Sequence, residues 1–165
     1  MKVKHELAPI YDEQSSLLIL GTMPSPKSRE VGFYYGHPQN RFWKIMNELY
    51  GESVQTIDEK VEFLHRHQIA LWDVLASCEI KGADDASIKQ PVVNDLSQLL
   101  KTTKIKTIFT TGKKASQLYA KYLEPQTKIK AIELPSTSAA NCRFYTYEDI
   151  LIAYQQILVY SRDTQ

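Results

Sequence analysis

The sequence predicts an α/β fold with three layers (α/β/α), in which a short, mostly parallel four-stranded sheet lies between two layers of helices. Four short apolar runs have the length of buried strands, and segments with helical periodicity separate them. The chain has 165 residues, of which 43% are hydrophobic, and this suffices for one compact core. We therefore expect a single domain that spans residues 1–165.

The expected elements follow one another along the chain. The strands are expected at residues 16–21, 69–74, 107–111 and 130–134. The helices are expected at residues 40–50, 57–67, 94–101 and 113–123, and a last helix continues to about residue 161. Thr146 and Asp149 resemble a capping box, which is why the last helix is expected to begin there.

Three polar or glycine-containing segments follow expected strands, and they are candidates for a functional site. A loop rich in proline and serine begins at Gly21, Asp73 ends the second apolar run, and a serine-rich loop follows Leu134. The carboxyl ends of parallel strands meet at one edge of a sheet, where ligands bind in such folds. We therefore expect these three segments to form one site.

The composition limits the classes of function. The formal net charge is +1, which neither indicates nor excludes a nucleic-acid-binding protein, because a local basic patch is sufficient. Cys78 and Cys142 form no CxxC pair, and His65 and His67 point in different directions on a helix, so we expect no metal and no cofactor. The reduced cysteines favour a cytoplasmic protein, nucleoid-associated in a prokaryote. No apolar run approaches the ~18 residues of a membrane span.

The aromatic run from Tyr34 to Trp43 has two interpretations. In the first, Asn40 caps the helix that begins there, and the aromatic side chains belong to the core. In the second, the aromatic rings offer a surface on which a base stacks, and the amide of Asn40 orients a water molecule. The two roles are compatible if each uses a different atom of the amide.

This run also carries a resemblance to a known family. Residues 32–44 resemble the H-P-x-N-R-F-W segment of the mismatch-specific uracil and thymine glycosylases, within the uracil-DNA glycosylase superfamily. Together with residues 21–28, they are more similar still to the hypoxanthine-DNA (DNA-deoxyinosine) glycosylases. Residues 134–142 resemble the second signature loop of that group, and residues 112–115 fit as well. The resemblance covers nearly the whole chain and implies a monofunctional DNA N-glycosylase acting on damaged double-stranded DNA as a monomer.

One departure from the mismatch-specific pattern affects the catalytic assignment. Met23 stands where the G-I-N-P-G motif of those enzymes has the asparagine that supports the attacking water. The hypoxanthine family also lacks that residue, so the resemblance assigns catalysis to Asn40, whose side-chain carbonyl would position the water. Tyr35 is expected to stack on the flipped base, a contact worth ~1–3 kcal/mol in nucleic-acid sites.

The resemblance and the chemistry of the side chains suggest further substrate contacts. Main-chain N–H groups of Met23 and Ser25 could donate to the base carbonyl, and His37 could hold the signature loop in place. Asp73 is at the position where the uracil-specific branch reads the base with asparagine. A carboxylate accepts the N1–H of hypoxanthine, but it also accepts the N–H of uracil. The alternative for Asp73 is a helix cap or a salt bridge with a lysine.

The remaining site residues are expected to contact DNA. The serine-rich loop offers small hydroxyl groups for phosphates, although such residues are also common in ordinary turns. Alanines replace the bulky wedge of the uracil branch, so the residue that fills the gap in the helix is left open between Asn141 and Arg143. The expected DNA-binding residues are Ser136, Thr137, Ser138, Ala139, Ala140, Asn141, Arg143, Lys27 and Lys113.

Two other functions are compatible with these patterns. One is a uracil glycosylase or a G·U/G·T mismatch glycosylase, because substrate range varies within the superfamily. The other is a module that binds lesions without chemistry, which the methionine at position 23 favours and Asn40 opposes. A nucleotide-binding doubly wound domain is disfavoured because no glycine-rich phosphate loop follows the first strand.

Overall fold

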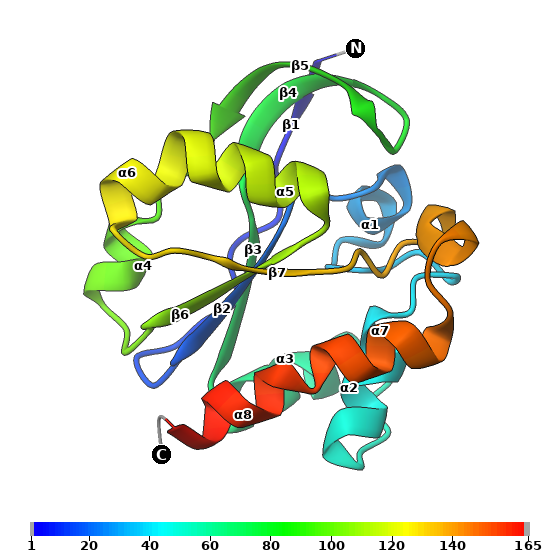
Figure 1. The fold of residues 1–165 in the computed structure, drawn as a ribbon, viewed down its shortest axis with the longest axis vertical. Helices are drawn as coiled ribbons and strands as arrows, with labels where there is room; N and C mark the ends of the chain where they lie inside the picture. The colour runs from blue at the N-terminus through cyan, green and yellow to red at the C-terminus, as the bar shows by residue number, and fades with distance from the viewer. Residues whose placement is uncertain (1, 164–165) are drawn as a thin grey trace.

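The computed structural model describes residues 2–163, apart from the side chains at 142, 143, 162 and 163 (Figure 1). Its centre is a four-stranded parallel sheet with the order β3-β2-β6-β7. The strands are β2 (Leu17–Gly21), β3 (Ile69–Asp73), β6 (Thr107–Thr111) and β7 (Ile132–Leu134). The predicted four-stranded parallel sheet is therefore confirmed, and each strand lies within two residues of its expected bounds.

Helices cover both faces of this sheet (Figure 1). Side chains of β2 alternate between the faces: Leu17 and Ile19 point to one core, and Leu18 and Leu20 to the other, all fully buried. The first face packs against α2 (Phe42–Tyr50), α3 (Ile57–Arg66), α7 (Tyr147–Tyr154) and α8 (Gln156–Asp163). The second packs against α4 (Ser97–Lys101), α5 (Lys113–Leu118) and the helical turns that follow it, a π-helical turn (Tyr119–Leu123) and α6 (Glu124–Thr127).

A second sheet was not predicted. It is antiparallel, with the order β1-β4-β5, and its strands are β1 (Lys2–Lys4), β4 (Leu75–Lys81) and β5 (Asp84–Val93). The chain passes from β3 into β4 across Val74 alone, so the small sheet begins where the central sheet ends. This arrangement brings both the N-terminal strand and the β4–β5 hairpin to the end of β3.

Two short helices follow strands of the central sheet, and the C-terminal helix departs from its predicted form. Ser25 caps α1 (Pro26–Val31) by accepting from the N–H of Ser28 at 3.1 Å. A 3₁₀ helix (Ala139–Arg143) follows the serine-rich loop. The predicted capping box of Thr146 and Asp149 is confirmed, but the last helix is interrupted at Gln155. Within residues 2–163, no helix is both long and apolar enough to span a bilayer.

Candidate active site

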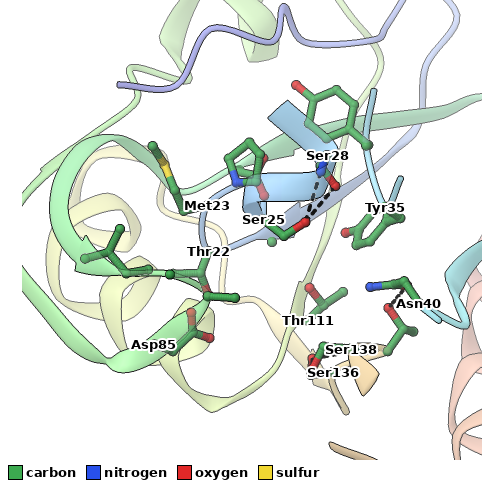
Figure 2. A pocket seen from close by; sticks show the side chains of 18 residues that line it. Thr22, Met23, Ser25, Ser28, Tyr35, Asn40, Asp85, Thr111, Ser136 and Ser138 are labelled. Carbon is green, nitrogen blue, oxygen red and sulfur yellow. Dashed lines mark hydrogen bonds between the residues drawn. The ribbon is translucent and has the colours of Figure 1, made fainter. Parts of the chain in front are cut away.

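A pocket of about 120 Å³ opens at the carboxyl edge of the central sheet (Figure 2). The three segments predicted to meet there do so: the loop that follows Gly21, Asp73 at the end of β3, and residues 136–138 all line it. Strand register explains this, because Gly21 pairs with Asp73 on one side of β2. The aromatic run contributes Tyr34, Tyr35 and Asn40.

Asn40 points into the pocket, and its side-chain oxygen is already engaged. The oxygen accepts hydrogen bonds from the N–H of Phe42 at 2.9 Å and from the hydroxyl of Thr137 at 2.8 Å. These donors occupy the two lone pairs of the carbonyl and fix the orientation of the amide, because the N–H of Phe42 can bond only to the oxygen. The amide nitrogen is therefore the atom directed into the pocket (Figure 2). The side-chain carbonyl of Asn40 was expected to position a water, but the group available for that role in the structure is the amide N–H₂.

Tyr35 forms one wall in a strained conformation. Its φ is 56°, in the left-handed region, which costs a non-glycine residue of order 1 kcal/mol or more. One ring face stacks on Phe42, with the centroids 3.9 Å apart and the planes 11° apart. Burial, and then the charge of Asp73, raise the pKa of the Tyr35 hydroxyl, while a hydrogen bond with Thr111 opposes the shift. A second ring could stack only on the opposite face of Tyr35.

Asp73 is 4% exposed and lies at the end of β3 in the pocket lining. Its ion-pair partner is His5, at 2.8 Å between Nε2 and Oδ2, and not the lysine considered from the sequence. Its main-chain carbonyl also accepts from the side-chain amide of Asn94 at 2.9 Å. Burial raises the pKa of the Asp73 carboxyl, and the hydrogen bond and charge of His5 lower it. His5 was not predicted as a site residue, because the strand that brings it here, β1, was itself not predicted.

The β4–β5 hairpin contributes a second carboxylate that sequence reasoning missed. Ile80, Gly82, Ala83 and Asp85 line the pocket, and Figure 2 shows Asp85 beside Thr22, across the pocket from Asn40. Desolvation raises the pKa of Asp85 to about 6, with smaller raising contributions from Asp84 and Asp73, whereas the charge of Lys114 and a hydrogen bond with Thr22 oppose the shift. Asp85 is exposed as a residue, so it lies at the mouth, in contrast to the buried Asp73.

The serine-rich loop is held against α2 by internal hydrogen bonds. Arg41 donates its main-chain N–H to Thr137 O at 3.0 Å and its guanidinium to Ser138 O at 3.4 Å and Tyr145 O at 3.2 Å. Asn141 donates to Ser136 O at 2.9 Å, which ties down one of the two residues considered for the DNA gap. The side chain of the other, Arg143, lies outside the described residues.

A groove of about 1250 Å³ runs beside the pocket. It shares Asp85, Ser136 and Ser138 with the pocket, and its other lining residues include Lys113, Lys114, Ala140, Asn141 and Phe144. Phe144 is 76% exposed, a feature that the sequence did not reveal. The groove therefore combines lysines, hydroxyl groups and an exposed ring, which are groups that bind a nucleic-acid backbone and its bases, with the carboxylates of Asp84, Asp85 and Glu133.

Not all predicted site residues reach the pocket or the groove. Met23 and Ser25 line the pocket, and Thr137 does so while bonded to Asn40. His37 is exposed on its loop and accepts from the N–H of Gln39 at 3.0 Å, so it shapes the loop rather than the pocket. Two others lie in neither lining: Lys27, which pairs with Glu30 at 3.4 Å, and Ala139. Among the described residues, no group of three His, Cys, Asp or Glu side chains is arranged to hold a metal ion.

Fold and site together define an α/β protein with a narrow pocket at the carboxyl edge of its parallel sheet and a lysine-bearing groove beside that pocket. The family model of the Uracil DNA glycosylase superfamily matches residues 8–156. This match covers most of the chain, and the protein therefore belongs to the uracil-DNA glycosylase superfamily.

Similar proteins agree with this assignment. A protein of Methanosarcina acetivorans named hypoxanthine DNA glycosylase is 34% identical over 148 residues, which are 86% of this chain and 90% of the relative. Its namesake from Methanosarcina barkeri is 36% identical over 146 residues, 85% and 89% of the two chains. The solution NMR structure of a proposed uracil DNA glycosylase from Methanosarcina acetivorans superposes with a TM-score of 0.79 at 30% identity, covering 96% of this chain and 99% of that one.

Proposed function

We propose that this protein is a monofunctional DNA N-glycosylase that releases hypoxanthine from deoxyinosine in double-stranded DNA and so begins base-excision repair. The observation that carries the proposal is the pairing of a buried acceptor, Asp73, with the amide of Asn40 in one pocket beside a lysine-bearing groove. Two relatives named hypoxanthine DNA glycosylase support the choice of substrate.

The pocket suits a base that has been rotated out of the duplex. Extrusion costs a few kcal/mol, and less at a mispair, which favours damaged sites. The free face of Tyr35 would stack on the flipped base, because Phe42 occupies the other face. Asp73 would accept the N1–H of hypoxanthine, and the main-chain N–H groups of Met23 and Ser25 would donate to its carbonyl oxygen.

The chemical step is hydrolysis of the bond between the sugar C1′ and the base nitrogen. The bonding electron pair leaves with the base, the sugar develops oxocarbenium character, and a water oxygen forms the new bond to C1′. Hydrogen-bond donors around the carbonyl oxygen would stabilise the charge that builds on the leaving base. The N–H₂ of Asn40 would hold the water, and its proton would pass through solvent at the mouth to the carboxylate of Asp85, which lies across the pocket.

Single-turnover base release tests the proposal. Duplexes carrying deoxyinosine, deoxyuridine or a G·T mispair are incubated with excess enzyme, and abasic sites are then cleaved with alkali. We expect deoxyinosine to react fastest and Asn40→Ala to lose at least about 100-fold in rate. Asn47→Ala is the matched control, since Asn47 also lies on α2 and bonds the main chain of Val54, but it lines neither cavity.

The other outcomes each favour another function. Faster release of uracil would retain the mechanism and replace the substrate, since uracil also offers an N–H to Asp73. Tight binding of damaged DNA with no release from any duplex would identify a lesion-binding module instead.

A further inference from the structure

His5 is fixed beside Asp73 by the small antiparallel sheet. Lys4 at the end of β1 pairs with Ser77 of β4, and the N–H of His5 donates to Ala76 O at 2.7 Å. The side chains of His5 and Asp73 are only 1% and 6% exposed. The imidazole also packs against the rings of Tyr34 and Trp72, with centroids 6.1 Å and 6.3 Å away. The pair is thus a built structural feature rather than a surface contact.

The two carboxylate oxygens of Asp73 have different surroundings. Oδ2 bonds to Nε2 of His5 at 2.8 Å. Oδ1 lies over Gly21, so close that an added Cβ on Gly21 would be 2.5 Å from it. Both residues line the pocket. His5 therefore engages Oδ2, and Oδ1, beside Gly21, is the oxygen that a base in the pocket would reach.

We propose that His5 is a positioning residue that sets base specificity by holding Asp73 as an ionised acceptor, an inference that rests on the proposed function. Hypoxanthine presents N1–H, a donor, where adenine presents the N1 lone pair. An ionised carboxylate only accepts, so it bonds hypoxanthine and repels adenine. A protonated carboxyl group could donate to adenine N1, and the distinction between the two bases would be lost.

Among the described residues that face Asp73, His5 is the group that favours the ionised form of the Asp73 carboxyl. Burial raises the pKa of Asp73, and only the hydrogen bond and charge of His5 are identified as lowering it. Tyr34 and Tyr35 lie nearby, but burial and then the charge of Asp73 raise their hydroxyl pKa values, so they contribute no positive charge. Asp85 and Asp73 disfavour ionisation of each other.

Equilibrium binding to DNA that cannot be cleaved tests the role of His5 apart from catalysis. Oligonucleotides carry deoxyinosine or deoxyadenosine at one position, each with a 2′-fluoro substituent that blocks bond breaking, and affinities are measured by fluorescence anisotropy at about pH 7. The quantity compared is the preference for deoxyinosine over deoxyadenosine. Dividing each variant's preference by the wild-type value cancels the differing costs of extruding the two bases.

We expect His5→Leu to lower this preference by about 10- to 100-fold, because a charge-assisted hydrogen bond is lost. His5→Gln, which can donate from a similar position, is expected to recover most of it. Asp73→Asn should abolish the preference, and adding His5→Leu to it should have no further effect. His67→Gln is the matched control, since His67 bonds the carboxylate of Glu52 at 2.6 Å away from the pocket.

The pH dependence of this preference, compared between wild type and His5→Leu, provides a second test. Because burial raises the pKa of the Asp73 carboxyl, lowering the pH protonates Asp73 and should reduce the preference, whereas that of Asp73→Asn should not change. Without the His5 bond, the decline should begin at higher pH. A His5→Leu protein with wild-type preference, additive effects in the double variant, or a decline that begins at the same pH in His5→Leu and wild type would each overturn the role of His5. None of these results depends on base release, so failure of the proposed glycosylase activity is separately detected.

Discussion

Asn40→Asp separates the structural role of this side chain from its catalytic role. Aspartate keeps an oxygen that accepts from the Phe42 N–H and the Thr137 hydroxyl, but it replaces the amide nitrogen that points into the pocket. Asn40→Ala removes both accepted hydrogen bonds. The loss of the helix-terminal bond costs about 1 kcal/mol, and the loss of the Thr137 bond about another 1 kcal/mol.

The two variants should therefore differ in stability but agree in activity. We expect Asn40→Ala to melt about 4–8 °C below the wild type, since about 1 kcal/mol corresponds to roughly 2–4 °C for a domain of this size. Asn40→Asp should melt within a few degrees of the wild type. Both should release hypoxanthine at least about 100-fold more slowly, because neither offers an N–H to the water.

Thermal unfolding followed by circular dichroism and single-turnover base release measure these two quantities on the same preparations. Thr137→Val is the control, because it removes one donor to the Asn40 oxygen and leaves the amide nitrogen in place. A rate for Asn40→Asp within about tenfold of the wild type would refute the reasoning, since it would show that an oxygen at this position suffices for catalysis.

Three further predictions concern the floor, the mouth and the groove of the site. Gly21→Ala should displace the Asp73 carboxylate, because the added Cβ would lie 2.5 Å from Oδ1, and affinity for uncleavable deoxyinosine DNA should therefore fall. The control is Gly51→Ala, at a position with positive φ away from the pocket, which should lower only the melting temperature. The wild-type single-turnover rate should fall with decreasing pH near about pH 6, as Asp85 gains a proton. Asp85→Asn should lower the maximal rate and flatten this part of the pH profile. An unchanged profile would exclude Asp85 as the proton acceptor. Phe144→Ala should weaken binding of damaged duplex DNA by about 1–3 kcal/mol, measured by fluorescence anisotropy, and should weaken binding of single strands less. The reason is that only a duplex has a gap, left by the flipped base, for the exposed ring to fill. Equal losses of affinity for duplex and single strand would assign Phe144 to general DNA contact.

The central sheet could be predicted because its signal is local. Each strand is a short apolar run, and the parallel order follows from the helices between the runs. The convergence of the Gly21 loop, Asp73 and the serine-rich loop was predictable for the same reason, since parallel strands share a carboxyl edge.

The antiparallel sheet was not predictable from the same signals. β5 is largely exposed along its length, so it lacks the apolar alternation that identifies a half-buried strand. β1 has three residues, of which only Val3 is buried. The site therefore contains two residues that the sequence did not indicate: His5 arrives through β1, and Asp85 through the β4–β5 hairpin.

The orientation of Asn40 was also beyond sequence reasoning, although its importance was not. An asparagine before a helix was recognised as both a cap and a catalytic candidate. In the structure the N-cap position of α2 is Arg41, and the oxygen of Asn40 accepts from the first helical N–H, that of Phe42. The oxygen is fixed by Phe42 and Thr137, residues from two segments that are about a hundred positions apart. The contact therefore joins the helix start to the serine-rich loop and fixes the direction of the amide nitrogen before any substrate binds.

The two carboxylates divide the recognition and chemical steps by depth. Asp73 is buried at the end of β3 and bonded to His5, so it can read the edge of a base that has entered fully. Asp85 lies at the mouth, where the sugar of a flipped nucleotide would remain and where water has access. The charge of Asp73 raises the pKa of Asp85, whereas His5 lowers the pKa of Asp73 and Lys114 lowers that of Asp85. Loss of His5 should therefore impair the choice of base, whereas loss of Asp85 should impair bond breaking for every base that the pocket accepts.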